Sequence, residues 1–133
     1  MTFSEFCKSL ENKIVQSYEQ GVTILEAERL AGEFLAAQIR VSEELKTLDL
    51  DSRMKKSGVK SIRAAIYLDI VQKSDRKPTE AQITALIDTD KIVMGEQEAL
   101  DIAEVNRDGL ERYYAIFVNA HLHFRNISKG KYE

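Results

Sequence analysis

The stretch from residue 90 to about residue 128 limits the possible folds more than any other part of the sequence. It contains no proline, and mostly apolar side chains recur along it at alternating steps of four and three. This spacing places about one side chain per turn on a single face of an α-helix. We therefore predict that the longest helix of the chain lies over this stretch and continues through Gly95 and Gly109. Its seam comprises Ala99, Ala103, Asn106, Leu110, Tyr113, Phe117, Ala120, Phe124 and Ile127.

A helix of this length does not fit inside a compact monomer. About 39 residues span roughly 58 Å, whereas a compact domain of 133 residues has a diameter of about 36 Å. We therefore expect an elongated helical hairpin or open bundle whose core is completed by oligomerisation. Two or three helices would cover the largest seam side chains poorly. The oligomerisation residues that we predict on this ground are Leu110, Tyr113, Phe117 and Phe124.

The sequence before residue 78 predicts two or three further helices. Apolar side chains at steps of three and four, from Phe3 to Tyr18, predict an N-terminal helix that Gly21 ends. Thr23 followed by Glu26 is a capping-box signature for the next helix. A weak break at "LDLDS", residues 48–52, separates it from a third helix that runs to about residue 73. The alternative is that the second helix continues directly into the third.

Pro78 is the clearest interruption of the helical pattern. It disfavours helix at Lys77, and Thr79 followed by Gln82 can cap a short helix over about residues 80–88. We therefore predict an all-α fold in a single domain over residues 1–133. Its parts are an N-terminal helix (1–21), a helical arm (22–77), and a short helix followed by the long C-terminal helix (78–133).

Composition indicates an ordered protein that does not enter a membrane. Hydrophobic residues make up 44% of the chain and charged residues 31%, as in folded globular domains. Cys7 is the only cysteine, so no internal disulfide can form, which fits a reducing compartment. No apolar run approaches the roughly 18 residues that span a bilayer, and Glu5 and Lys8 interrupt any signal-like segment. We expect a cytoplasmic protein.

No group of residues in the sequence predicts an enzyme. The chain contains no Ser-His-Asp order, no glycine-rich phosphate loop and no Cys-His cluster. His121 and His123 are two residues apart and would point about 200° away from each other on a helix, so they form a poor pair of metal ligands. We expect no catalytic activity, no cofactor and no metal site.

Positive charge is concentrated in one segment of an otherwise acidic chain. The chain has 19 Lys and Arg residues against 22 Asp and Glu residues, yet residues 53–77 hold eight cations and two acids. On a helix, Arg53, Lys56, Lys60 and Arg63 fall within an arc of roughly 80° beside an apolar face, and Tyr67 lies one turn beyond. The candidate nucleic-acid-binding residues are Arg53, Lys55, Lys56, Lys60, Arg63, Tyr67, Lys73, Arg76 and Lys77.

Two interpretations of this basic stripe remain open. Cations that follow phosphates and an aromatic ring that stacks on an unpaired base are typical of proteins that bind single-stranded DNA. Alternatively, the stripe is a solvated face or pairs with acids such as Glu43 and Glu44 of a neighbouring helix, and Tyr67 serves in packing. In the first interpretation we expect Lys60 and Arg63 to be exposed.

The order of segments over about residues 45–128 resembles the UvsY-like phage recombination mediators. The resemblance rests on "IRAAIYLD" after the basic patch, on "PTEAQITALIDTDKIV", and on the long helix ending in "AHLHFRNISKG". It implies a ring-like homo-oligomer that binds single-stranded DNA. It also implies a partnership with a RecA-type recombinase, which it helps to load onto strands coated by single-strand-binding protein. Lys60 and Arg63 match the family's Lys/Arg motif, but they are three residues apart rather than two.

A second function fits the same helices without nucleic acid. The chain would then be a helical protein-interaction module of phage origin, such as an assembly factor or a factor that blocks a host defence. Binding to a labelled single strand that weakens with salt distinguishes the two functions, because only the first predicts it.

Overall fold

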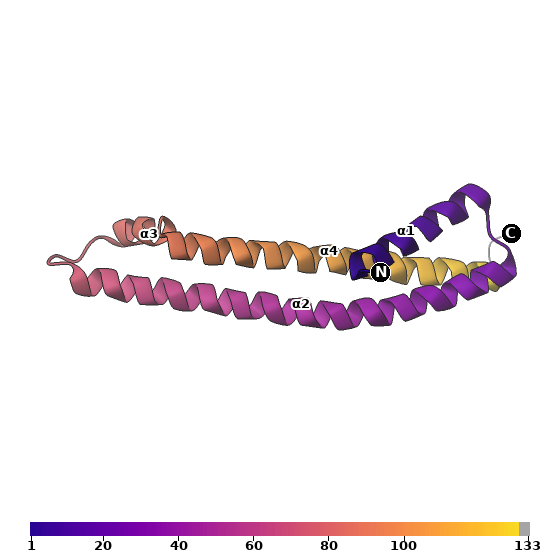
Figure 1. Ribbon diagram of the computed structural model, residues 1–133, viewed down its shortest axis with the longest axis horizontal. Coiled ribbons are helices and arrows are strands. Elements are labelled where there is room, and N and C mark those ends of the chain that lie inside the picture. Colours follow the sequence, from indigo (N-terminus) through magenta and orange to yellow (C-terminus); the bar gives the residue numbers. More distant parts are fainter. Residues whose placement is uncertain (131–133) are drawn as a thin grey trace. The chain divides into compact units, whose positions relative to one another are not determined.

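The computed structural model describes residues 1–130, and all of the regular structure in that range is helical. The helices are α1 (Phe3–Gln20), α2 (Ile24–Lys73), α3 (Glu80–Asp88) and α4 (Lys91–Ser128), in the order that Figure 1 shows. No strand occurs within residues 1–130. The predicted all-α fold is therefore confirmed.

The two longest helices are continuous. α4 runs for 38 residues through both of its glycines, as predicted. α2 runs for 50 residues, so the expectation that the longest helix lies over residues 90–128 is wrong. The break at residues 48–52 does not form, and the continuous alternative is correct. Asp49 and Asp51 form ion pairs with Arg53 and Lys55 one turn later, at 3.0 and 2.7 Å, and such pairs stabilise a helix through its weakest residues.

The helix ends follow the capping chemistry that the sequence carries. Thr79 Oγ1 accepts a hydrogen bond from the Gln82 backbone N–H, and Gln82 accepts one from the Thr79 N–H, so both halves of the predicted capping box form. Gly21 ends α1 at φ 75°, a conformation that a residue with a Cβ rarely adopts. Asp90 separates α3 from α4, because its carboxylate accepts a hydrogen bond from the Ile92 N–H at 2.9 Å.

Contacts within the chain divide it into two compact units. Unit 1 comprises Met1–Leu45 together with the residues from Gly109 onward, and unit 2 comprises Lys46–Asp108. Both α2 and α4 contribute residues to each unit. The interpretation of residues 1–133 as a single domain stays a prediction.

Unit 1 has an aromatic core. Phe34 of α2 lies 5.6 Å, between ring centroids, from both Phe117 and Phe124 of α4, and all three rings are fully buried. Buried rings of this kind each remove about 150–250 Å² from water. The expectation that Phe117 and Phe124 need a second chain to cover them is therefore wrong. Leu110 is also buried and Tyr113 half-buried, so none of these four needs a partner chain for cover.

Unit 2 has a smaller, aliphatic core. Ile83 and Ile87 of α3 and Val93 of α4 form a buried cluster, against which one face of α2 packs its half-buried side chains Ile62, Ile66, Tyr67, Ile70 and Val71. Unit 2 leaves more large apolar side chains in solvent than it buries. The exposed ones are Leu50, Met54, Leu68, Leu86, Ile92, Met94, Ile102 and Val105; the buried ones are Val59, Ile83, Ile87, Val93 and Leu100.

Candidate nucleic-acid interface

The free part of the basic stripe consists of two lysines on adjacent turns of α2. Lys56 and Lys60 are both exposed, and neither forms an ion pair with any residue in the range 1–130. Residues four apart on a helix are neighbours, about 6 Å apart at their Cβ atoms. The two ammonium groups can therefore contact neighbouring phosphates of one strand.

The two cations that precede them are paired with acids of the same helix. Arg53 donates to Asp49 at 3.0 Å, and its side chain keeps 76% of its surface exposed. Lys55 lies 2.7 Å from Asp51. Exposed pairs of this spacing contribute only about 0.3–0.5 kcal/mol. A phosphate can therefore displace the Asp49 carboxylate from Arg53 at small cost.

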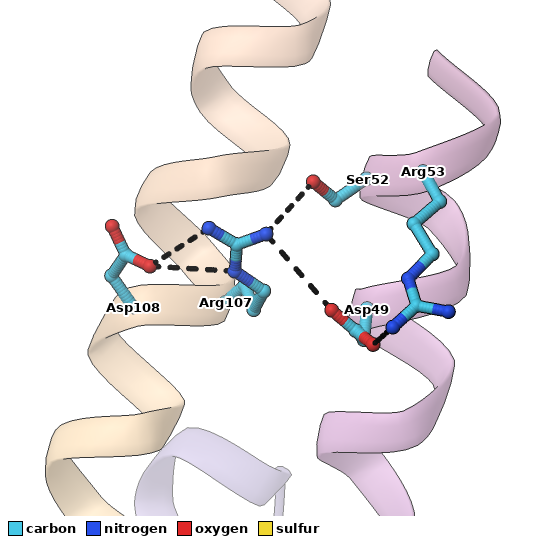
Figure 2. Close-up of polar contacts among 5 residues, drawn as sticks. All are labelled: Asp49, Ser52, Arg53, Arg107 and Asp108. Atoms are coloured by element: carbon cyan, nitrogen blue, oxygen red, sulfur yellow. Dashed lines mark hydrogen bonds and ion pairs between the residues drawn. The ribbon is translucent and has the colours of Figure 1, made fainter. Parts of the chain in front are cut away.

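Figure 2 shows that Asp49 also belongs to a polar contact between α2 and α4. Arg107 of α4 donates to the Ser52 hydroxyl at 3.3 Å and to Asp108 at 3.2 Å, and its guanidinium lies 3.9 Å from Asp49. Ser52 is only 2% exposed, and a buried hydroxyl needs such a partner. Arg107 thus satisfies Ser52 and helps to hold Asp49 in place beside Arg53.

The predicted seam contains the wrong residue at this point of the helix contact. Asn106 was expected there, but Asn106 is exposed and Arg107 reaches α2 instead. Arg107 lies four residues after Ala103 and three before Leu110, so the strict alternation of the predicted seam is broken at this one turn. A long Arg side chain can pack its stem at a contact and extend its charged head to polar groups, which is the signal that was missed.

Arg63 belongs to the contact between α2 and α3. Its guanidinium lies 2.9 Å from Asp88 at the end of α3, and its side chain is 35% exposed. The expectation that both Lys60 and Arg63 are exposed is therefore correct for Lys60 and wrong for Arg63. Arg63 contacts a phosphate only if it first gives up Asp88.

The surface next to Arg63 does not favour an anion either. A shallow cleft of about 740 Å³ opens beside the Arg63–Asp88 pair. Its charged lining consists of two cations and three acids: Arg63, Lys91, Asp88, Glu98 and Asp101. Because carboxylates outnumber cations by one in this lining, the cleft gives a phosphate no net electrostatic attraction.

Tyr67 is used in packing. Its half-buried ring lies against the core cluster of unit 2, and its hydroxyl donates to Glu80 Oε1 at 3.0 Å. A ring in this position has one side taken by the protein, so the structure favours the packing interpretation that the sequence left open. Stacking of Tyr67 on a base stays an untested prediction.

The last three candidate cations differ in their pairing. Lys73 lies 3.0 Å from Asp69, and Lys77 lies 3.8 Å from Glu80. Arg76 is exposed and has no ion pair within the described part of the chain. The acids that pair with the basic segment are thus its close neighbours on α2 and residues of α3, rather than Glu43 and Glu44.

Two titratable groups with shifted pKa values, Cys7 and Tyr113, lie in unit 1. Burial raises the pKa of the Cys7 thiol. A hydrogen bond to Glu11 is the main cause that raises the pKa of Tyr113 to about 12. Both groups therefore favour their neutral forms near neutral pH.

The two histidines make contacts within unit 1. The His121 ring nitrogen Nδ1 lies 2.8 Å from the Ala31 carbonyl oxygen, and the His123 ring stacks on Tyr18 at 5.6 Å. Residues 1–130 contain no group of three or more side chains that could hold a metal ion. In the same range, no helix is both long enough and apolar enough to cross a membrane.

Comparisons with protein families, with curated proteins and with solved structures find no match to this chain. The resemblance to UvsY-like mediators therefore rests on the order of sequence segments alone.

Proposed function

We propose that the chain is a single-stranded-DNA-binding protein that associates with itself and acts as a recombination mediator. The observation that carries the DNA-binding part is the pair Lys56 and Lys60, exposed on one helix face without an ion pair in the described chain. Arg53 and Arg76 extend this charge, because both are exposed and Arg53 is held only by a solvated pair. The contact is with phosphates and so is independent of base sequence.

The mediator role comes from the resemblance in segment order. On that basis the protein helps to load a RecA-type recombinase onto DNA coated by single-strand-binding protein. We also propose an elongated hairpin or open bundle that is completed by oligomerisation. The lengths of α2 and α4, at 50 and 38 residues, support this arrangement, and small-angle X-ray scattering tests it.

Fluorescence anisotropy with a labelled 30-nucleotide strand tests the DNA-binding proposal. If Lys56, Lys60 and Arg76 each contact one phosphate, the slope of log affinity against log salt is about −2. Affinity then falls about twentyfold between 50 and 200 mM salt. Replacing Lys56 and Lys60 together by alanine reduces the magnitude of the slope by about 1.4 and weakens binding to all sequences.

The matched control is the double substitution Lys8→Ala and Arg112→Ala. Both residues are exposed cations in unit 1, so the control changes the net charge equally but leaves the stripe intact. We expect the control to bind like the wild type. Equal loss of affinity in the two double variants would show that net charge, rather than the stripe, attracts the DNA. Absence of wild-type binding at 50 mM salt would refute the proposal.

A second function is favoured by the apolar surface of unit 2. Eight large apolar side chains of this unit are more than half exposed, and exposed apolar patches mark contact sites for proteins. A protein-interaction module that does not bind nucleic acid would use this surface alone. It is the better description if the protein fails to bind the single strand at 50 mM salt yet self-associates or captures another protein.

A further inference from the structure

α2 carries a second apolar face within unit 2, directed away from the core of that unit. Its positions follow one another at steps of four, three, four, three and four: Leu50, Met54, Ser57, Ser61, Ala64 and Leu68. All six are exposed, and Leu50, Met54 and Leu68 keep 60%, 65% and 57% of their surface in solvent. At 100° per residue, this face lies about 180° from the line through the buried residues Ser52 and Val59.

No charged residue lies on this face. Residues 50–68 contain five cations and one acid. These six charged residues lie on other sides of the helix. A helix face that only contacts water normally carries charged and polar side chains. A face that combines large apolar residues, small residues and no charge has the composition of a contact between helices.

We infer that a second copy of this chain covers the face, with its own α2 running antiparallel. The pattern is symmetric about its centre, so an antiparallel copy places Leu50 opposite Leu68, Ser57 opposite Ser61, and Met54 opposite Ala64. Large residues then meet small ones at the Met54 level, and leucines close both ends. A parallel copy would instead stack Met54 on Met54 and Ala64 on Ala64, which packs unevenly.

Antiparallel pairing also places the basic stripes of both copies on one side of the contact. Arg53 and Lys60 lie within roughly 80° of the centre of the apolar face, on the same flank. A twofold axis normal to an antiparallel pair keeps that flank on the same side in both copies. Arg53, Lys56 and Lys60 of the two copies then form a group of six cations within about 18 Å along the helix direction. A parallel pair would place the two stripes on opposite sides.

These six cations make the pairing dependent on anions. Each copy contributes one face of about five helical turns, so fewer residues make contact than the 20–30 per side of a standard interface. The like charges on one flank also repel each other. We therefore expect a dissociation constant in the micromolar range without DNA. A polyanion that binds the joined stripes strengthens the dimer, and the dimer strengthens binding by the same factor. This coupling rests on the proposed function, whereas the pairing itself does not.

Sedimentation of the double variant Leu50→Glu, Leu68→Glu tests the pairing. Both side chains are exposed and Glu is a good helix former, so helix content and the unfolding transition should match the wild type. We expect the wild type to form a dimer at 100 μM and the variant to keep the mass of one chain, 15.1 kDa. The control Leu86→Glu, Ile102→Glu changes two equally exposed side chains outside α2 and should remain a dimer.

Cysteine cross-linking tests the orientation. Cys7 is only 1% exposed, so the wild type serves as the control that should not cross-link. Leu50→Cys mixed with Leu68→Cys should form a disulfide-linked dimer under mild oxidation, whereas either variant alone should not. If instead each variant cross-links when it is tested alone and the mixture forms no Leu50→Cys to Leu68→Cys disulfide, the pair is parallel and the inference is overturned.

The outcomes separate the pairing from the proposed function. A dimer that fails to bind a 30-nucleotide oligo(dT) leaves the pairing intact and ends the DNA-binding proposal. A wild type that stays monomeric at 100 μM, with and without the oligonucleotide, overturns the pairing even if it binds DNA. A dimer that survives the Leu50→Glu, Leu68→Glu change also overturns it, because its contact then lies elsewhere.

Discussion

Aromatic rings fill the core of unit 1, whereas aliphatic side chains form the smaller core of unit 2. In unit 1 the rings of Phe34, Phe117 and Phe124 come from two helices and are fully buried. In unit 2 the cluster of Ile83, Ile87 and Val93 is flanked by many apolar side chains that remain in solvent. Unit 1 thus buries three aromatic rings within one chain, whereas the buried core of unit 2 contains no aromatic ring.

The polar contacts of the two units also differ. In unit 1, His121 and Gln38 reach backbone carbonyl oxygens, those of Ala31 and Phe117. In unit 2, most ion pairs join exposed side chains of the basic segment to acids close by. Such solvated pairs stabilise little and exchange easily. The ion pairs of the basic segment therefore hold their cations only weakly.

The largest effect should come from the aromatic core of unit 1. Phe34→Ala removes a fully buried ring that contacts two others, and such changes cost about 3–5 kcal/mol. Urea unfolding followed by circular dichroism measures the loss. A cost below about 1 kcal/mol, well under the range for buried aromatics, would contradict the contrast between the units.

A smaller effect is expected from the polar contact of unit 2. Arg107→Ala leaves the buried Ser52 hydroxyl without the donor that Figure 2 shows, and an unsatisfied buried group costs about 1–3 kcal/mol. The double variant Arg107→Ala, Ser52→Ala removes both partners and should recover part of that loss. Additive costs in this double-mutant cycle would mean that the hydrogen bond contributes nothing.

The smallest effect concerns Tyr113 and appears at high pH. The folded-state pKa of about 12 exceeds the usual value of 10, so the stabilising contribution is complete below about pH 10 and declines as the pH rises toward 12. Tyr113→Phe removes the hydrogen bond to Glu11 at a cost of about 1 kcal/mol near neutral pH. Unfolding free energies measured from pH 8 to 11.5 should show a shallower alkaline decline in the variant than in the wild type.

Local sequence signals predicted the helices well because capping and spacing are local properties. Thr79 and Gln82 define the start of α3 where the sequence predicted it, and the spacing from Ala103 to Phe124 defines the buried face of α4. The sequence left the continuity of α2 at residues 48–52 open, because two effects oppose each other there. Asp has a low helix propensity, whereas the ion pair from Asp49 to Arg53 stabilises the helix.

Tertiary properties could not be read from the same signals. The burial of Phe117 depends on Phe34, which is distant in the sequence. The half-burial of Arg63 depends on Asp88 of another helix. The basic charge of the stripe was visible in the sequence, but which cations lack an ion pair was not. Lys56 and Lys60 were therefore predicted as members of a larger set, and the structure distinguishes them within it.

The order in which the two units occur along the chain has a consequence for folding during synthesis. Unit 2 is one continuous segment, whereas unit 1 joins the first part of the chain to residues that follow Asp108. Phe34 therefore leaves the ribosome well before Phe117 and Phe124 can cover it. At 5–20 residues per second, the intervening unit of about 60 residues takes roughly 3–12 s to synthesise. During that interval the side of α2 that carries Phe34 lacks its α4 partners, so the core of unit 1 can close only after unit 2 has been synthesised.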